Sequence, residues 1–261
     1  WGDALVENIR TARTLGIDTQ VVNYWRVRSN EHNARAAADA MWDPDADPEA
    51  LSEAYFRALY GPGAAALART AYRSLEAATI LAKERTFNVG FTADWVVRIC
   101  TEPPGYYWRH LHQVGTAYRE ATAHFDALAS LASQAPVRTS SRGASQARYM
   151  ADLCRISALH LSAVHHLQMA KLPLVGFRLW PLPAQDPPGL PPPDFLAALL
   201  REARAGLELE YEYMRILAGW TRTCDEQGQL AMHQQGLIEP YEELVAALAR
   251  WVGQEAGRAP G

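Results

Sequence analysis

Residues 19–33 read Thr-Gln-Val-Val-Asn-Tyr-Trp-Arg-Val-Arg-Ser-Asn-Glu-His-Asn, a short apolar run that gives way abruptly to aromatic, cationic and amide side chains. A helix-like segment, Trp1 to Leu15, precedes this stretch, and another, Ala34 to Trp42, follows it. The order helix, buried strand, polar strand end and helix is typical of α/β barrels and doubly wound sheets. Because ligands in such folds bind at the C-terminal ends of the strands, we predict a strand at Gln20–Tyr24 with a ligand-binding edge after it.

Beyond residue 33 the pattern indicates helices, and no second segment has the pattern of a β/α unit. Asp47, Pro48 and Glu49 form a helix-start signal: Asp caps free backbone N–H groups, Pro suits the first helical position, and Glu favours the positive end of the helix dipole. Gly61 and Pro62 mark the end of that helix. Further helices are predicted over residues 64–85, 106–133, 145–171, 194–217 and 240–252.

Two stretches are predicted to interrupt these helices. The first is a loop at residues 140–143, Ser-Ser-Arg-Gly. The second is the proline-rich segment 172–193, which is predicted to form an ordered irregular loop anchored by Phe177, Leu179 and Trp180.

Polar residues on the last long helices are interpreted as structural. Asp194 is predicted to cap the helix that follows it. The acidic residues at positions 208, 210 and 212 are interpreted as a solvated charged flank, because no Glu-x-x-His motif accompanies them. His160 lies on the apolar stripe of the preceding helix, which favours a core or interface histidine over a ligand.

The composition limits the function classes. The chain has 261 residues, is 49% hydrophobic and 21% charged, and can therefore bury a core. A net charge of −4 implies no general surface for nucleic acid, and no apolar run approaches the roughly 20 residues that span a bilayer. The three cysteines are far apart and odd in number, which argues against a disulfide framework. With no visible signal peptide, the sequence favours a cytoplasmic location.

Several motifs resemble those at the barrel exit of large bacterial glycoside hydrolases. They are Trp25-Arg26, Asn33, the segment 40–51 (Ala-Met-Trp-Asp-Pro-Asp-Ala-Asp-Pro-Glu-Ala-Leu), Tyr55-Phe56 and the segment 59–62 (Leu-Tyr-Gly-Pro). The segment from Trp220 to Pro240 resembles the end of the helical domain in the same enzymes. These are the β-N-acetylhexosaminidase-like and α-glucuronidase-like hydrolases, in which a (β/α)8 barrel is followed by a helical domain.

The resemblance implies a fold class and a domain organisation. Residues 1–45 would be the last helix, strand and helix of a (β/α)8 barrel, and residues 46–261 a bundle-like C-terminal helical domain, so the chain would be mainly α. It would form the C-terminal portion of a carbohydrate-active enzyme, with the helical domain beside the barrel active site. The preceding strands, where such enzymes keep their acid/base and nucleophile carboxylates, are absent from the chain.

Candidate site residues follow the predicted strand. Tyr24 and Trp25 are candidates for substrate binding because aromatic rings stack on the apolar faces of sugars. Arg26 can hold a hydroxyl or carboxylate with its planar fork, and Arg28 and Asn33 complete the candidate set. Core packing is the alternative for the aromatic pair.

Glu31 is the candidate catalytic group, and a helix-start or surface role is the alternative reading. Glycoside hydrolysis needs two carboxyl groups roughly 5–10 Å apart, and the nearest other acids are Asp39, on the following helix, and the more distant Asp94. We therefore expect the isolated chain to lack glycosidase activity. No metal site and no cofactor are predicted, since no metal-binding or dinucleotide motif occurs.

Two functions stay open at this stage. The first is the enzyme portion, whose partner is a carbohydrate substrate bound through the upstream barrel. The second is a non-enzymatic helical module that binds a partner chain. Neither nucleic acid nor a membrane is an expected partner, and self-association into a homo-oligomer is expected if the surface meant for the barrel is exposed.

Overall fold

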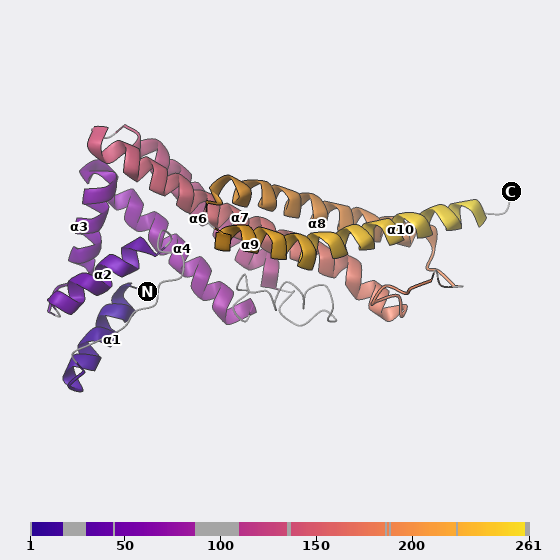
Figure 1. The fold of residues 1–261 in the computed structure, drawn as a ribbon, viewed down its shortest axis with the longest axis horizontal. Coiled ribbons are helices and arrows are strands. Elements are labelled where there is room, and N and C mark those ends of the chain that lie inside the picture. The colour runs from indigo at the N-terminus through magenta and orange to yellow at the C-terminus, as the bar shows by residue number, and fades with distance from the viewer. Residues whose placement is uncertain are drawn as a thin grey trace. The chain divides into compact units, whose positions relative to one another are not determined.

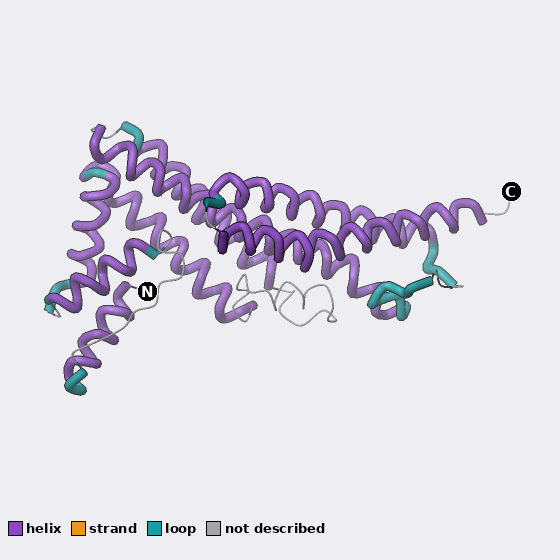
Figure 2. Tube along the Cα trace, viewed as in Figure 1, coloured by secondary structure: helices purple, strands orange, loops and turns teal. Residues whose placement is uncertain are grey.

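In this computed structural model the chain is helical (Figures 1 and 2). The structure describes residues 2–17, 30–43, 45–86, 110–134, 137–185, 187, 189–222 and 224–258. The predicted mainly α class is confirmed, and no strand occurs in these ranges. The strand predicted at Gln20–Tyr24 falls outside them. None of the described helices combines the length and the low polarity that a bilayer crossing requires.

The chain divides into two compact units. The first contains residues 1–77 and 120–153, and the second contains residues 78–119 and 154–261. Each unit is therefore built from two stretches of sequence. The boundary predicted between residues 45 and 46 stays a prediction.

The first unit begins with helices α1 (Gly2–Thr14) and α2 (Glu31–Trp42). Both start near the N-terminus in Figure 1 and run in the same general direction. The Arg13 guanidinium donates to the Met41 carbonyl at 3.2 Å, which joins their C-terminal ends. The helices bury a small shared core of Val6, Ile9, Ala37 and Ala40.

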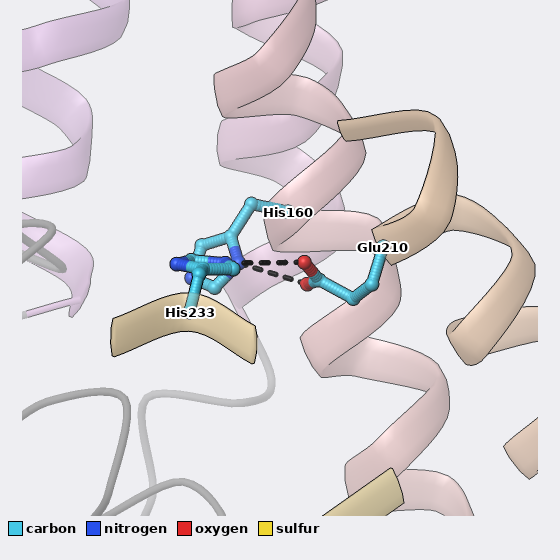
Figure 3. Close-up of side chains that lie close together, drawn as sticks. All are labelled: His160, Glu210 and His233. Atoms are coloured by element: carbon cyan, nitrogen blue, oxygen red, sulfur yellow. Dashed lines mark hydrogen bonds and ion pairs between the residues drawn. The ribbon is translucent and has the colours of Figure 1, made fainter. Parts of the chain in front are cut away.

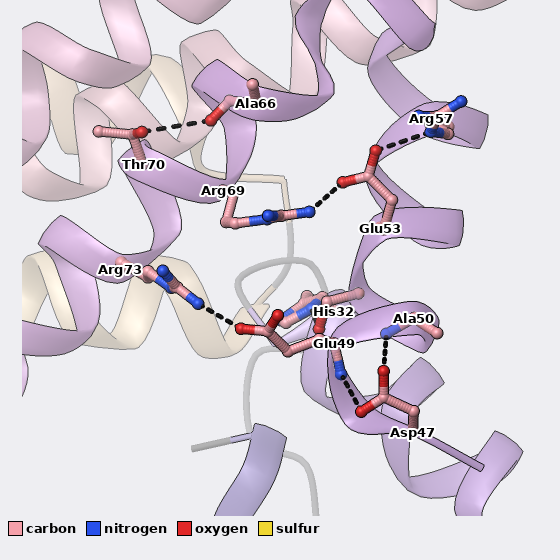
Figure 4. Close-up of polar contacts among 11 residues, drawn as sticks. His32, Asp47, Glu49, Ala50, Glu53, Arg57, Ala66, Arg69, Thr70 and Arg73 are labelled. Atoms are coloured by element: carbon pink, nitrogen blue, oxygen red, sulfur yellow. Dashed lines mark hydrogen bonds and ion pairs between the residues drawn. The ribbon is translucent and has the colours of Figure 1, made fainter.

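Helix α3 (Pro48–Tyr60) begins as the sequence predicts. The Asp47 carboxylate accepts hydrogen bonds from the backbone N–H groups of Glu49 and Ala50, at 3.3 and 3.2 Å (Figure 4). Pro48 occupies the first helical position, and Gly61 ends the helix with a φ of 90°. The cap satisfies two N–H groups that the first helical turn leaves free.

A short 3-10 turn, η1 (Pro62–Ala64), leads into α4 (Ala65–Thr86). Arginines of α4 form ion pairs with acids of α3, as Figure 4 shows for Arg69 with Glu53 and for Arg73 with Glu49. The second pair is largely exposed and therefore contributes little to stability.

Aromatic side chains pack together inside the first unit. The rings of His32, Phe56 and Tyr72 pack against one another, with centroids 5.0–5.3 Å apart. The hydroxyl groups of Tyr60 and Tyr72 are 3.0 Å apart. Phe125 of α6 (Leu111–Ala132) meets Tyr72 edge-on. This cluster ties α2, α3, α4 and α6 into one core.

Helix α7 (Val137–Gly176) corrects the loop predicted at residues 140–143. The Ser-Ser-Arg-Gly composition indicated a loop, but the residues are helical. Gly143 is buried, and a Cβ atom there would lie 2.3 Å from the Leu59 carbonyl oxygen. The glycine is therefore present for close helix packing and not for a turn.

The proline-rich segment begins later than predicted. Residues 172–176 still belong to α7, with Pro173 inside the helix, and the irregular segment follows Gly176. Leu179 is buried and Trp180 is partly buried against the core of the second unit, as predicted. Phe177, the third predicted anchor, is 51% exposed, and its ring meets that of Phe195 edge-on with centroids 5.5 Å apart.

The second unit is completed by α8 (Pro193–Trp220), α9 (Cys224–His233), the π-helical turn η3 (Gln234–Ile238) and α10 (Glu239–Arg258). The predicted Asp194 cap is wrong, because Pro193 occupies the first position of α8 and places Asp194 inside the first turn. Helices α8 and α10 lie side by side and run in opposite directions (Figure 1). Large buried side chains between the helices include Leu199, Leu207, Tyr241, Leu248 and Trp251.

Candidate functional site

Most of the substrate-binding residues predicted from sequence lie outside the described part of the chain. These are Tyr24, Trp25, Arg26 and Arg28. Their role as a carbohydrate-binding edge stays a prediction. Asp94, the remote acid, also lies outside the described residues.

Glu31 and Asn33 lie in the first turn of α2, and both are half-buried. The Glu31 carboxylate forms an ion pair with Arg142 of α7. Asp39 lies two turns further along α2, about 12 Å along the helix axis, and pairs with Arg35 at 2.7 Å. Each of these two acids is therefore held by an arginine.

A different group of side chains meets in the core of the second unit. His160 of α7, Glu210 of α8 and His233 of α9 converge from three helices (Figure 3). His160 Nδ1 lies 2.9 Å from Glu210 Oε1, and His233 Nε2 lies 3.2 Å from Glu210 Oε2. The exposed fractions of the three side chains are 1%, 0% and 2%.

The burial of Glu210 corrects the prediction of a solvated flank. The buried positions of α8 include Ala203, Leu207, Glu210 and Tyr213, which follow one another at spacings of three and four residues. Glu210 therefore occupies a position in the apolar stripe that faces the core. The neighbouring acids Glu208 and Glu212 suggested a charged face. The spacing of Glu210 from Leu207 and Tyr213 indicates burial instead.

His160 is buried as predicted, and its spacing explains why. It lies four residues from Ile156 and from Val164, which are both buried on the same face of α7. His233 is the last residue of α9, directly before the π-helical turn. A π-helical turn is rare and is often found at functional sites.

Ring packing holds the two imidazoles in place. The Tyr213 ring stacks on His233 with centroids 4.3 Å apart and planes inclined by 19°. The ring of His160 meets that of His233 edge-on at 5.2 Å. Both imidazoles therefore face the Glu210 carboxylate with little rotational freedom.

Burial acts to raise the pKa of the Glu210 carboxyl. The attraction and hydrogen bond of His160, together with the hydrogen bond of His233, outweigh burial and hold that pKa below its ordinary value. Burial lowers the pKa of the His233 imidazole, and its hydrogen bond with Glu210 offsets only part of this. The core therefore contains an ionised carboxylate beside a neutral His233 at neutral pH.

The cluster brings together two imidazole nitrogens and two carboxylate oxygens, which are donor types common to transition-metal sites. Sequence reasoning missed the cluster because its members are 50 and 23 residues apart and form no short motif. The only sequence signal was polar residues on two apolar stripes, at His160 and Glu210.

Comparisons with protein-family models, curated proteins and solved structures found no match for this chain.

Proposed function

We propose that the chain is the C-terminal part of a carbohydrate-active enzyme, a glycoside hydrolase-like protein whose helices pack beside a (β/α)8 barrel. The observation that carries the proposal is the parallel packing of α1 and α2. Helices joined by a short loop run antiparallel, whereas successive helices of a β/α barrel run parallel because a strand returns the chain between them.

The length of the connection is consistent with such a unit. Helix α2 has 12 residues and is therefore about 18 Å long. About six residues in extended conformation cover that distance, and the connection from Leu15 to Asn30 contains more than twice that number. The predicted strand Gln20–Tyr24 lies within this connection. Its polar end would carry Tyr24, Trp25 and Arg26 to the edge where barrel enzymes bind substrate.

Exposed apolar side chains at the same end of the first unit support the proposal. The exposed fractions of Leu15, Ile17 and Trp42 are 71%, 48% and 91%. They lie at or just beyond the C-terminal ends of α1 and α2, which the Arg13–Met41 hydrogen bond holds together. Apolar residues gathered on a surface mark a contact with another protein surface, and an adjoining barrel would provide it.

The test compares the 261-residue chain with the longer polypeptide encoded by its natural reading frame. Both are assayed against a panel of aryl glycosides and aryl uronides. We expect turnover only by the longer polypeptide, because a general acid needs a second positioned carboxylate to complete glycoside hydrolysis. Turnover by the short chain that disappears in Glu31→Gln would contradict the expectation and make Glu31 catalytic.

Inactivity of both polypeptides, or a reading frame without further β/α units, would overturn the proposal. The result would favour the alternative function, a non-enzymatic helical module that binds a partner chain. In that case Leu15, Ile17 and Trp42 would belong to the binding surface for the partner.

A further inference from the structure

We propose that His160, Glu210 and His233 bind one divalent transition-metal ion, with Zn²⁺ as the preferred occupant, in the core of the second unit. The inference does not depend on the proposed glycoside hydrolase function. It rests on the geometry of the three side chains, on their burial and on the backbone around His233.

The spacing of the donor atoms fits one shared ion. All three ligand atoms lie within 4.8 Å of one another, and the two nitrogen–oxygen distances are 2.9 and 3.2 Å. Donor atoms about 2.0–2.1 Å from a tetrahedral zinc are separated by about 3.3 Å. The two nitrogen–oxygen contacts lie within a few tenths of an ångström of that separation, and the remaining pair of donor atoms is at most 4.8 Å apart, so the side chains would close around the ion as it binds.

The donor set supplies three protein ligands, one from each residue, and a water molecule would complete a four-coordinate zinc. Glu210 presents one carboxylate oxygen to each histidine (Figure 3). His160 would bind through Nδ1 and His233 through Nε2. Two imidazoles and a carboxylate suit Zn²⁺ and also Co²⁺, Ni²⁺ or Fe²⁺, whereas Mg²⁺ and Ca²⁺ require mainly oxygen ligands.

Burial requires the Glu210 carboxylate to be neutralised by a partner, and a metal ion is one such partner. A carboxylate and two imidazoles with no more than 2% exposure have lost their contact with water. Isolated charges are costly in such surroundings, and buried charges in proteins are usually paired or bind metals. A dication would interact with all three residues at once and would offset the negative charge of Glu210.

The backbone beside His233 is the independent observation. The Glu239 N–H donates to the Gln234 carbonyl, which is the wider bonding pattern of a π-helix. This turn keeps His233, Leu237 and Ile238 all directed into the core. Since π-helical turns are uncommon and are often found at functional sites, the position of this one indicates that the placement of His233 is needed.

The ion would have a structural role. It would link the three consecutive helices α7, α8 and α9 and would stabilise the second unit as a cross-link does. A structural ion needs no access for a substrate, and the burial of the three side chains is consistent with this role.

The first measurement is the metal content of the purified chain, freed of any affinity tag, after exposure to Zn²⁺ and removal of excess ion. We expect about one zinc per chain. Substitution by Co²⁺ should produce the visible absorption of a low-coordinate nitrogen and oxygen site. A wild-type chain that retains no zinc would overturn the proposal.

Variants locate the site. Glu210→Gln and His233→Gln should weaken zinc binding by at least about 100-fold, since even residues that only support a metal ligand change affinity by 10- to 100-fold. The matched control is His166→Gln. His166 Nδ1 pairs with Glu202 Oε2 at 2.8 Å between the same two helices, α7 and α8, but the pair is partly exposed and has no third ligand among the residues that the structure describes.

Folding of each variant is checked by circular dichroism. If a variant unfolds, X-ray absorption of the zinc-loaded wild type decides the question, and imidazole plus carboxylate ligation is expected. A sulfur ligand in that spectrum, or unchanged zinc binding in both folded variants, would place the ion elsewhere and overturn the proposal.

Discussion

A Cβ atom added to Gly143 would lie 2.3 Å from the backbone carbonyl oxygen of Leu59. Helix α7 can therefore approach the C-terminal end of α3 only because residue 143 has no side chain. The obstacle is backbone, which cannot rotate away as a flexible side chain can.

Replacing Gly143 with Ala should destabilise the protein by about 2–3 kcal/mol, the upper part of the range for overpacked cores. Urea denaturation followed by circular dichroism measures the change. The control is Gly253→Ala on α10, where nothing lies within 4 Å of the added Cβ and helix propensity favours alanine. Equal stability of Gly143→Ala and wild type would contradict the packing described here.

Removal of the proposed metal should lower the melting temperature. An ion present at about 100 times its dissociation constant stabilises the folded state by about 2.7 kcal/mol, which corresponds to about 5–10 °C for a chain of this size. Calorimetry with and without a chelator measures the difference, and added Zn²⁺ should restore it. Glu210→Gln should show no response to the chelator, while His166→Gln should respond as the wild type does.

Alkaline pH should destabilise the first unit through its buried tyrosines. Burial raises the pKa of Tyr55, Tyr60 and Tyr72 well above the ordinary value of about 10. A raised pKa in the folded state contributes stability that is fully present below pH 10 and is lost as the pH rises above it.

The measurement is the free energy of unfolding between pH 10 and 12. Each tyrosine that stays protonated only in the folded state adds a slope of up to about 1.4 kcal/mol per pH unit. Tyr72→Phe should make the slope shallower, although loss of the Tyr60–Tyr72 hydrogen bond lowers stability at neutral pH. An unchanged slope would show that Tyr72 ionises equally in both states.

Replacing Trp42 with Ser should leave the stability of the isolated chain within about 0.5 kcal/mol, because the side chain is 91% exposed. The same change should reduce self-association, measured by sedimentation, and should lower the activity of the longer polypeptide. Ile80→Ser is the control, because Ile80 is an exposed apolar residue that belongs to the second unit, whereas Trp42 belongs to the first. Equal effects of the two changes would argue against a specific contact at Trp42.

Helix starts and ends followed from the sequence where a local interaction sets them. The cap of α3 is the clearest example, because Asp47 needs only the next three residues to form its hydrogen bonds. The same local rule failed at Asp194, where Pro193 takes the first helical position. The loop predicted from the composition of residues 140–143 failed for a different reason. Glycine is necessary at position 143 because of Leu59, which is distant in the sequence.

The buried cluster was beyond sequence reasoning for the same reason. His160 could be placed in the core from its apolar neighbours, and Glu210 could have been from its spacing to Leu207 and Tyr213. Their pairing with His233 depends on which helices pack together, and no periodicity in one segment contains that information. The residues predicted to bind carbohydrate lie outside the described residues, apart from Asn33.

The position of His233 in the cluster depends on the number of residues in the π-helical turn. Each residue of an α-helix rotates the chain by about 100°, so deleting one residue within Gln234–Ile238 and restoring an ordinary helix would turn His233 away from Glu210. Descendants of this sequence can exchange side chains in the turn more readily than they can lose a residue from it. Wherever His160 and Glu210 persist together, insertions and deletions should therefore be found in other segments and be excluded from this one.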